Sequence, residues 1–165
     1  MAPVRAANAP AGHVSGPGCE DESSGATGAL RLLGDQMGDA THHEQLVMDF
    51  FGAWASGDTD RVLSFFADDG VYHNIPVDPL TGHEAIRGMI EMFTTGLTVV
   101  EFKVLNMLSD GPQVMTERVD IFRKDDGGTV ELPVMGILEF EGDKIKSWRE
   151  YFDLNQFMTQ AMPPA

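Results

Sequence analysis

Cysteine is almost absent from this chain of 165 residues, because Cys19 is the only one. One cysteine can form neither a disulfide within the chain nor a thiolate metal site, so the fold depends on its hydrophobic core. Long apolar runs are missing too, and no stretch approaches the roughly 20 residues that a membrane-spanning helix needs. The first residues also lack the apolar segment of a secretory signal. We therefore expect a cytoplasmic protein with no membrane partner.

Basic residues are scarce as well. Lys and Arg total 11 against 26 Asp and Glu, which gives a formal net charge of −15. Such an acidic surface repels phosphate backbones and anionic membranes, so we expect no nucleic-acid partner.

The remaining composition is that of a globular protein, with 42% hydrophobic and 22% charged residues. Residues 1–38 are rich in Ala, Gly, Pro and Ser and bury too little apolar surface to offset the entropy of ordering, so they predict a disordered tail. Residues 39–165 have the length of a single domain. Thr41, with Glu44 three residues later, has the spacing of a capping box at the first helix.

Helical periodicity dominates the first half of this domain. Apolar residues recur at helical spacing up to Gly57, and Asp58 is placed to cap a second, short helix that runs to Phe66. The Asp-Gly pair at 69–70 predicts a turn before a strand at 71–75. A third helix is predicted at 82–93.

The second half has strand character. Four strands are predicted at 99–108, 113–123, 129–140 and 144–152, joined by glycine-containing turns that favour hairpins. A short helix is expected at 153–162. Helices followed by strands predict an α+β fold, in which a curved antiparallel or mixed sheet packs against the N-terminal helices and a pocket lies between them.

Five polar residues interrupt these apolar strands: Tyr72, Asn74, Arg118, Asp120 and Glu150. Tyr72 and Asn74 are two residues apart, as are Arg118 and Asp120. Because a strand places residues i and i+2 on one face, each pair points into the same space. The pattern alone leaves open whether that face is the core or the solvent, where an Arg–Asp pair contributes little.

Glu150 favours the inward arrangement. It lies between Trp148 and Phe152, and a carboxylate among aromatic side chains needs a cation, for which Arg118 is the candidate. One Arg shared by two carboxylates separates their proton affinities, so that one acts as acid and the other as base. The alternative is a polar network in the core with no catalytic role. The histidines lack the spacing of a zinc motif, and nothing resembles a phosphate loop or a nucleotide-binding fingerprint, so we expect no metal or cofactor.

Three segments carry a resemblance to a known family. Residues 65–74, 116–120 and 148–154, the last reading Trp-Arg-Glu-Tyr-Phe-Asp-Leu, resemble the limonene-1,2-epoxide hydrolase family in order and interval. The resemblance covers about residues 44–157. It implies a cone-shaped fold like that of nuclear transport factor 2 and ketosteroid isomerase, also called SnoaL-like, in a homodimer. It also implies cofactor-free addition of water to a small lipophilic epoxide, which gives a vicinal diol.

The same resemblance implies roles for the five residues. Tyr72 and Asn74 match the residues that position the water, Arg118 matches the bridging Arg, and Asp120 matches the acid that protonates the epoxide oxygen. The family's base is an Asp, whereas this chain has Glu150. The extra methylene moves the carboxylate by on the order of an ångström, a displacement that can cost about a hundredfold in rate.

Two other functions fit the same pattern. One is an isomerase or cyclase on this fold, in which a carboxylate moves a proton beside a carbonyl or an internal hydroxyl opens an epoxide. The other is a non-catalytic module that binds a ligand or a partner.

Overall fold

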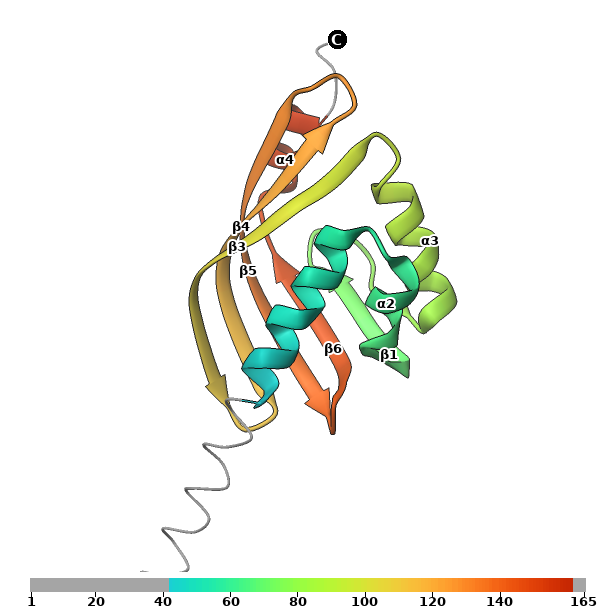
Figure 1. The fold of residues 1–165 in the computed structure, drawn as a ribbon, viewed down its shortest axis with the longest axis vertical. Coiled ribbons are helices and arrows are strands. Elements are labelled where there is room, and N and C mark those ends of the chain that lie inside the picture. Colours follow the sequence, from blue (N-terminus) through green and yellow to red (C-terminus); the bar gives the residue numbers. More distant parts are fainter. Residues whose placement is uncertain (1–41, 162–165) are drawn as a thin grey trace, which may run out of the picture.

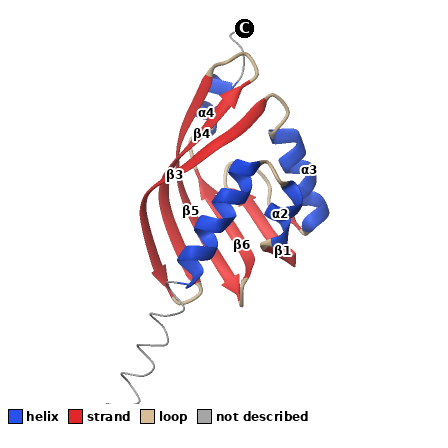
Figure 2. Ribbon diagram, in the orientation of Figure 1, coloured by secondary structure: helices blue, strands red, loops and turns tan. Residues whose placement is uncertain are grey.

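A six-stranded sheet with helices packed against one face forms the body of the protein (Figures 1 and 2). The computed structural model describes residues 42–161. The predicted tail at 1–38, Cys19 and the cap at Thr41 lie outside the described residues.

The first half of the described chain combines helices with strands, and four long strands and a short helix follow. A first helix occupies residues 42–56. After it come α2 (Thr59–Ser64), β1 (Phe66–Asn74), β2 (Leu80–Thr81), α3 (His83–Phe93), β3 (Leu97–Asp110), β4 (Gln113–Lys124), β5 (Thr129–Glu141), β6 (Lys144–Tyr151) and α4 (Leu154–Ala161). The α+β fold and the four long strands predicted from the sequence are confirmed, with ends that differ by at most two residues.

The sheet is mixed, with the strand order β2-β1-β6-β5-β4-β3. Strands β3, β4, β5 and β6 form an antiparallel meander, whereas β1 pairs with β6 in parallel. The parallel pair brings a strand from the first half of the chain beside the last strand. As a result Tyr72 lies opposite Trp148, and Asn74 lies opposite Glu150.

The helix at 42–56 covers the concave face of the sheet (Figure 1). It buries Val47, Phe50, Phe51 and Trp54, which recur at helical spacing and so share one side of the helix. Phe50 packs edge-on against Trp148 of β6 at a centroid distance of 4.9 Å. Packing of this aromatic stripe onto the sheet forms the core.

The next two helices begin and end where the sequence indicates. Asp58 caps α2 by accepting a hydrogen bond from the Arg61 backbone N–H at 2.9 Å. Gly82, with a φ of 82°, leads into α3, and Ile86 and Ile90 face the core. Among the described residues no helix is both long and apolar enough to cross a membrane.

The region around Asp69-Gly70 corrects the prediction. The pair lies inside β1 rather than in a turn before it, and Phe66, predicted in the second helix, begins the strand. The pairing of β1 with β6 shifts register between Phe66 and Val71, so this segment forms a bulge. A Cβ at Gly70 would lie 2.9 Å from the carbonyl oxygen of Ile145, and only glycine allows this close approach of two backbones.

Replacing Gly70 with alanine is therefore expected to destabilise the protein. The new methyl group would contact backbone atoms that cannot move without disturbing β6, and overpacking of this kind costs roughly 1–3 kcal/mol. Gly52→Ala is the matched control, because Gly52 is exposed in the helix at 42–56 and a Cβ there has no neighbour within 4 Å. That variant is expected to gain about 0.5–1 kcal/mol. Urea denaturation of the two variants and the wild type measures both changes in the free energy of unfolding. If Gly70→Ala is as stable as the wild type, the close approach of the Gly70 and Ile145 backbones is contradicted.

Candidate functional site

Four neighbouring strands meet at one level of the sheet, with polar residues on three of them and a glycine on the fourth. Asn74 of β1 pairs with Glu150 of β6, Glu150 pairs with Gly136 of β5, and Gly136 pairs with Thr116 of β4. Because paired residues on adjacent strands share a face, these positions form a row across the concave side. The sequence places each residue on its strand, and the pairing of strands brings them together.

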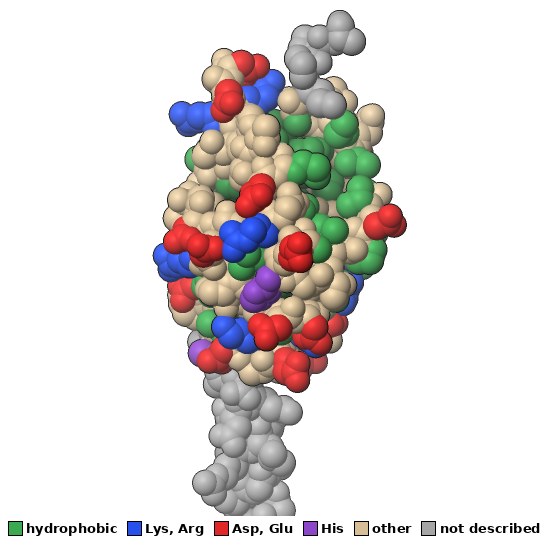
Figure 3. Space-filling model, turned by 90° about the vertical axis from the view of Figure 1, so that its right-hand side faces the viewer, with side chains coloured by type: hydrophobic (Ala, Val, Ile, Leu, Met, Phe, Trp, Pro, Cys, Tyr) green, Lys and Arg blue, Asp and Glu red, His purple; other side chains and the backbone are tan. Residues whose placement is uncertain are grey.

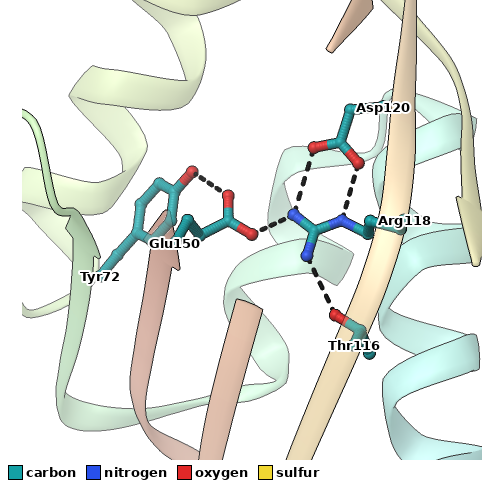
Figure 4. A network of polar contacts seen from close by, with 5 residues as sticks. All are labelled: Tyr72, Thr116, Arg118, Asp120 and Glu150. Atoms are coloured by element: carbon teal, nitrogen blue, oxygen red, sulfur yellow. Dashed lines mark hydrogen bonds and ion pairs between the residues drawn. The ribbon is translucent and has the colours of Figure 1, made fainter. Parts of the chain in front are cut away.

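Arg118 lies two residues beyond Thr116 on β4, and its guanidinium is the centre of the polar network (Figure 4). Its Nε donates to Asp120 Oδ1 at 2.7 Å and its Nη2 to Asp120 Oδ2 at 3.1 Å, which is the bidentate arrangement of a strong Arg–carboxylate pair. Nη1 donates to Thr116 Oγ1 at 3.1 Å. Nη2 also donates to Glu150 Oε1. One guanidinium therefore contacts both carboxylates, in the arrangement expected from the sequence.

Glu150 connects the guanidinium to the phenol of Tyr72. Its Oε2 accepts a hydrogen bond from Tyr72 Oη at 3.1 Å, while Oε1 is bound by Arg118. Tyr72 stacks on Trp148 with ring centroids 4.4 Å apart, which fixes the direction of its hydroxyl. The two oxygens of Glu150 thus have different neighbours, and only Oε2 is free of the cation.

The whole group is buried. Arg118 is 1% exposed and Asp120 and Glu150 are each 4% exposed, so the inward arrangement of Arg118 and Asp120 is the one that the fold adopts. The guanidinium carbon lies 5.0 Å from the ring centre of Phe51 and 5.2 Å from that of Phe102. These aromatic faces attract the cation and keep water away from it.

Burial changes the proton affinities of the two carboxyls. Burial raises the pKa of Asp120 to about 7, although Arg118 opposes this rise. Burial likewise raises the pKa of Glu150, against the lowering effect of Arg118. Burial disfavours the charged form of Arg118, but the two carboxylates outweigh it and raise the pKa of the guanidinium. A single buried cation balances one carboxylate charge, so near neutral pH the pair retains one proton.

The phenol and the amide complete the polar end of the site. Burial raises the pKa of Tyr72 well above its usual value, so the hydroxyl keeps its proton and acts as a donor. Asn74 Oδ1 is buried and has no hydrogen-bond partner among the described residues. An unpaired buried acceptor is costly unless a bound molecule satisfies it, and Asn74 lines the same pocket as Glu150.

This pocket has about 450 Å³ of empty space, including its opening to solvent, and its walls are mainly apolar. Asp120, Glu150, Tyr72 and Asn74 supply the polar groups. The remaining walls come from the helix at 42–56, α3, α4 and the inner face of the sheet. A volume of this order with a few convergent polar groups is typical of a site for a small organic molecule.

Two residues of the site were missed by sequence reasoning. Gly136 provides the space for the guanidinium, because a Cβ there would lie 2.6 Å from Arg118 Nη1 and 3.4 Å from Glu150 Oε1. Its signal is a glycine at an inward position of an otherwise apolar strand, which indicates close approach. The strand period puts Thr116 on the same face as Arg118 and Asp120, but it does not predict the hydrogen bond that Thr116 accepts from Arg118 Nη1. Within residues 42–161 no three His, Cys, Asp or Glu side chains lie close enough together to hold a metal ion.

Comparison with known proteins places this chain in a family. The model of the SnoaL-like domain matches residues 47–148, more than half of the chain. Among curated proteins, the chain is similar to the epoxide hydrolase EphG of Mycobacterium tuberculosis. The two are 30% identical over 105 residues, and this alignment covers 64% of this chain and 69% of EphG.

Solved structures agree with this assignment. An LEH-like epoxide hydrolase from M. tuberculosis superposes with a TM-score of 0.65 at 26% identity, covering 74% of this chain and 90% of its own. A ketosteroid isomerase-like fold from Catenulispora acidiphila, solved with trimethylamine, has a TM-score of 0.63 at 23% identity, covers 72% of this chain and 93% of its own, and shows the fold alone. The chain therefore belongs to the SnoaL-like domain family, with the nuclear transport factor 2-like fold that its sequence predicts.

Proposed function

We propose that this protein is a cofactor-independent epoxide hydrolase, which adds water in one step to a small lipophilic epoxide and releases a vicinal diol. The observation that carries the proposal is the buried guanidinium of Arg118, which is shared by Asp120 and Glu150, two carboxylates that line an apolar pocket. Two carboxylates with one proton between them supply an acid and a base together, which is what opening an epoxide with water requires.

Glu150 is the base in this mechanism. Its Oε2 accepts a hydrogen bond from the Tyr72 hydroxyl, whereas Oε1 accepts one from Arg118. A water bound between Glu150 Oε2 and Asn74 Oδ1 would satisfy the unpaired amide oxygen and lie against the carboxylate. Glu150 removes a proton from this water as the water oxygen bonds to one epoxide carbon.

Asp120 is the acid. As the carbon–oxygen bond of the ring breaks, Asp120 transfers its proton to the departing oxygen, so no alkoxide accumulates. A pKa of about 7 allows this carboxyl to be protonated near neutral pH and still to release its proton readily. Arg118 stabilises whichever carboxylate is ionised, and a proton passed from Glu150 back to Asp120 restores the starting state.

The comparisons support this proposal. The EphG relative and the LEH-like structure are both epoxide hydrolases. The homodimer and the cytoplasmic location expected from the sequence stay predictions. The isomerase or cyclase and the non-catalytic module are separated from hydrolysis by the experiments below.

Removing either carboxylate is expected to abolish diol formation while the fold persists. Asp120→Asn and Glu150→Gln keep the side-chain shape but remove the acid and the base, each of which contributes roughly 10²–10⁴-fold to such reactions. Turnover of a panel of terpene, cycloalkene and aryl epoxides in ¹⁸O-labelled water measures the loss, and the wild-type diol should carry one labelled oxygen. Full activity in either variant contradicts the proposal.

Glu139→Gln is the matched control, because Glu139 lies on β5 outside the pocket and pairs with Arg149 at 2.8 Å. It should retain wild-type activity. A product without label from the wild type would favour the cyclase or isomerase. Binding of epoxides that stabilises the protein without any turnover would favour the non-catalytic module.

The rate is expected to fall as pH rises through about 7, since Asp120 then loses the proton that it must donate. The same ionisation affects stability. Burial raises the folded-state pKa of Asp120 above its unfolded value of 3.8. The stability that the protonated carboxyl contributes is therefore fully present below the unfolded pKa and is lost as pH rises through about 7. Profiles of kcat/KM and of Tm across this range test both effects. In Asp120→Asn the corresponding decrease in Tm should vanish, and a flat wild-type rate profile would refute the role of Asp120.

Shortening the base is expected to slow the reaction without stopping it. Glu150 reaches both Arg118 and Tyr72 with its full length, so Glu150→Asp withdraws the carboxylate by about an ångström, a displacement that can cost up to about a hundredfold. Single-turnover kinetics should place kcat of Glu150→Asp between those of the wild type and Glu150→Gln. If kcat of Glu150→Asp equals that of Glu150→Gln, a displaced carboxylate is no better than an amide, and the position of the carboxylate is decisive.

A further inference from the structure

In the part of the chain that the structure describes, the first half of β5 pairs with β4 on one side but has no strand on the other side, where β6 pairs with the second half. β5 spans Thr129–Glu141, but within the described residues its pairing with β6 covers only Met135 to Glu141. The open edge between 129 and 134 would otherwise expose unpaired backbone groups. Pro133 lies in this half, where its missing N–H leaves no gap in a ladder.

The helix α4 covers this edge through a side-chain amide. The Glu131 backbone N–H donates to Gln160 Oε1 at 2.9 Å, and Gln160 Nε2 donates to the Glu131 carbonyl oxygen at 3.0 Å. An amide group has the same donor and acceptor as a backbone peptide, so Gln160 takes the place of a residue in a neighbouring strand. Gln156 Nε2 adds a longer contact to the same carbonyl oxygen at 3.4 Å.

This attachment positions Phe157, which lies on α4 three residues before Gln160 and lines the pocket. Its ring stacks on Phe93 of α3 with centroids 5.4 Å apart and planes inclined by 13°. It also meets Phe122 of β4 edge-on at 6.3 Å. None of the described residues of α4 is fully buried, so the Gln160 amide pair and these rings carry much of its attachment.

The position of Phe157 relative to the reacting groups follows from β4. Phe122 is two residues beyond Asp120 on the same face, which places it about 7 Å farther along the strand. Phe157 packs against Phe122, so it forms the pocket wall about one ring's width beyond the acid. Hydrophobic side chains also gather at the surface on the upper part of the face that carries α3 (Figure 3).

We propose that Phe157 determines specificity by limiting how far the hydrocarbon part of the substrate extends beyond Asp120, and that Gln160 is the positioning residue that holds it there. This inference rests on the proposed function. A substrate with one ring attached to the epoxide fits within the wall, whereas a second ring in line with the first meets Phe157.

The test compares cyclohexene oxide with 4-cyclohexylcyclohexene oxide, which share the reacting ring and differ by a second one. In Phe157→Ala the ratio of kcat/KM for the two-ring over the one-ring epoxide should rise roughly tenfold or more, mainly through KM. Phe157→Leu should raise the ratio less, and it replaces the alanine variant if that variant does not fold.

Gln160→Glu tests the positioning role. A carboxylate has no N–H to donate to the Glu131 carbonyl oxygen, so α4 should loosen and the ratio should rise in the same direction, while the pH profile set by Asp120 stays unchanged. Thr159→Ala is the control on the same helix, because Thr159 is exposed and its hydroxyl donates only to Asn155 within α4. It should behave as wild type.

Binding distinguishes failure of this inference from failure of the proposed function. Both tryptophans of the chain, Trp54 and Trp148, line the pocket, so tryptophan fluorescence reports occupancy by the unreactive pair cyclohexanol and 4-cyclohexylcyclohexanol. If the variants shift the relative affinity but no form of the protein opens an epoxide, the specificity role stands and the hydrolase proposal fails. If Phe157→Ala and Phe157→Leu leave both ratios unchanged, Phe157 does not limit the substrate. Wild-type ratios in Gln160→Glu would overturn the positioning role.

Discussion

The site depends on one electrostatic constraint, which is that the buried cation of Arg118 must be paired. A guanidinium that is 1% exposed persists only if carboxylates and hydrogen-bond acceptors replace its water, and Asp120, Glu150 and Thr116 do so. One cation cannot balance two carboxylates, however. The excess is resolved by retaining a proton, and this retained proton is what makes the site suited to acid–base chemistry.

The rest of the fold makes that constraint possible. Gly136 leaves the volume in which the guanidinium lies, and the rings of Phe51 and Phe102 exclude water from its faces. The parallel pairing of β1 with β6 brings the phenol of Tyr72 to the far side of Glu150. The polar groups thus come from separate strands, and the aromatic side chains of the helix at 42–56 shield them from bulk solvent.

Glu150 is longer by one methylene than the Asp that the resemblance to the epoxide hydrolase family implies at this position. The longer side chain reaches Arg118 with one oxygen and Tyr72 with the other, so the carboxylate is held from both sides. At the opposite end of the pocket the restraint is of another kind. There α4 follows the open edge of β5, and a glutamine amide substitutes for the missing strand. In the functions that we propose, the chemistry and the limit on substrate size therefore belong to different parts of the fold.

Local rules were sufficient for much of this protein. Periodicity located three helices and four strands, and the spacing of two put Arg118 with Asp120 and Tyr72 with Asn74 on common faces, because the side-chain period of a strand is a property of the backbone. The same rules misplaced Asp69-Gly70, whose bulge depends on the backbone of Ile145. The spacing of two left the face of Arg118 undecided, although the aromatic neighbours of Glu150 favoured the inward one, and no local rule gave a role to Gly136 or Gln160. Those features were decided by tertiary structure, since burial, proton affinity and the pairing of a strand edge arise only when segments far apart in the chain come into contact.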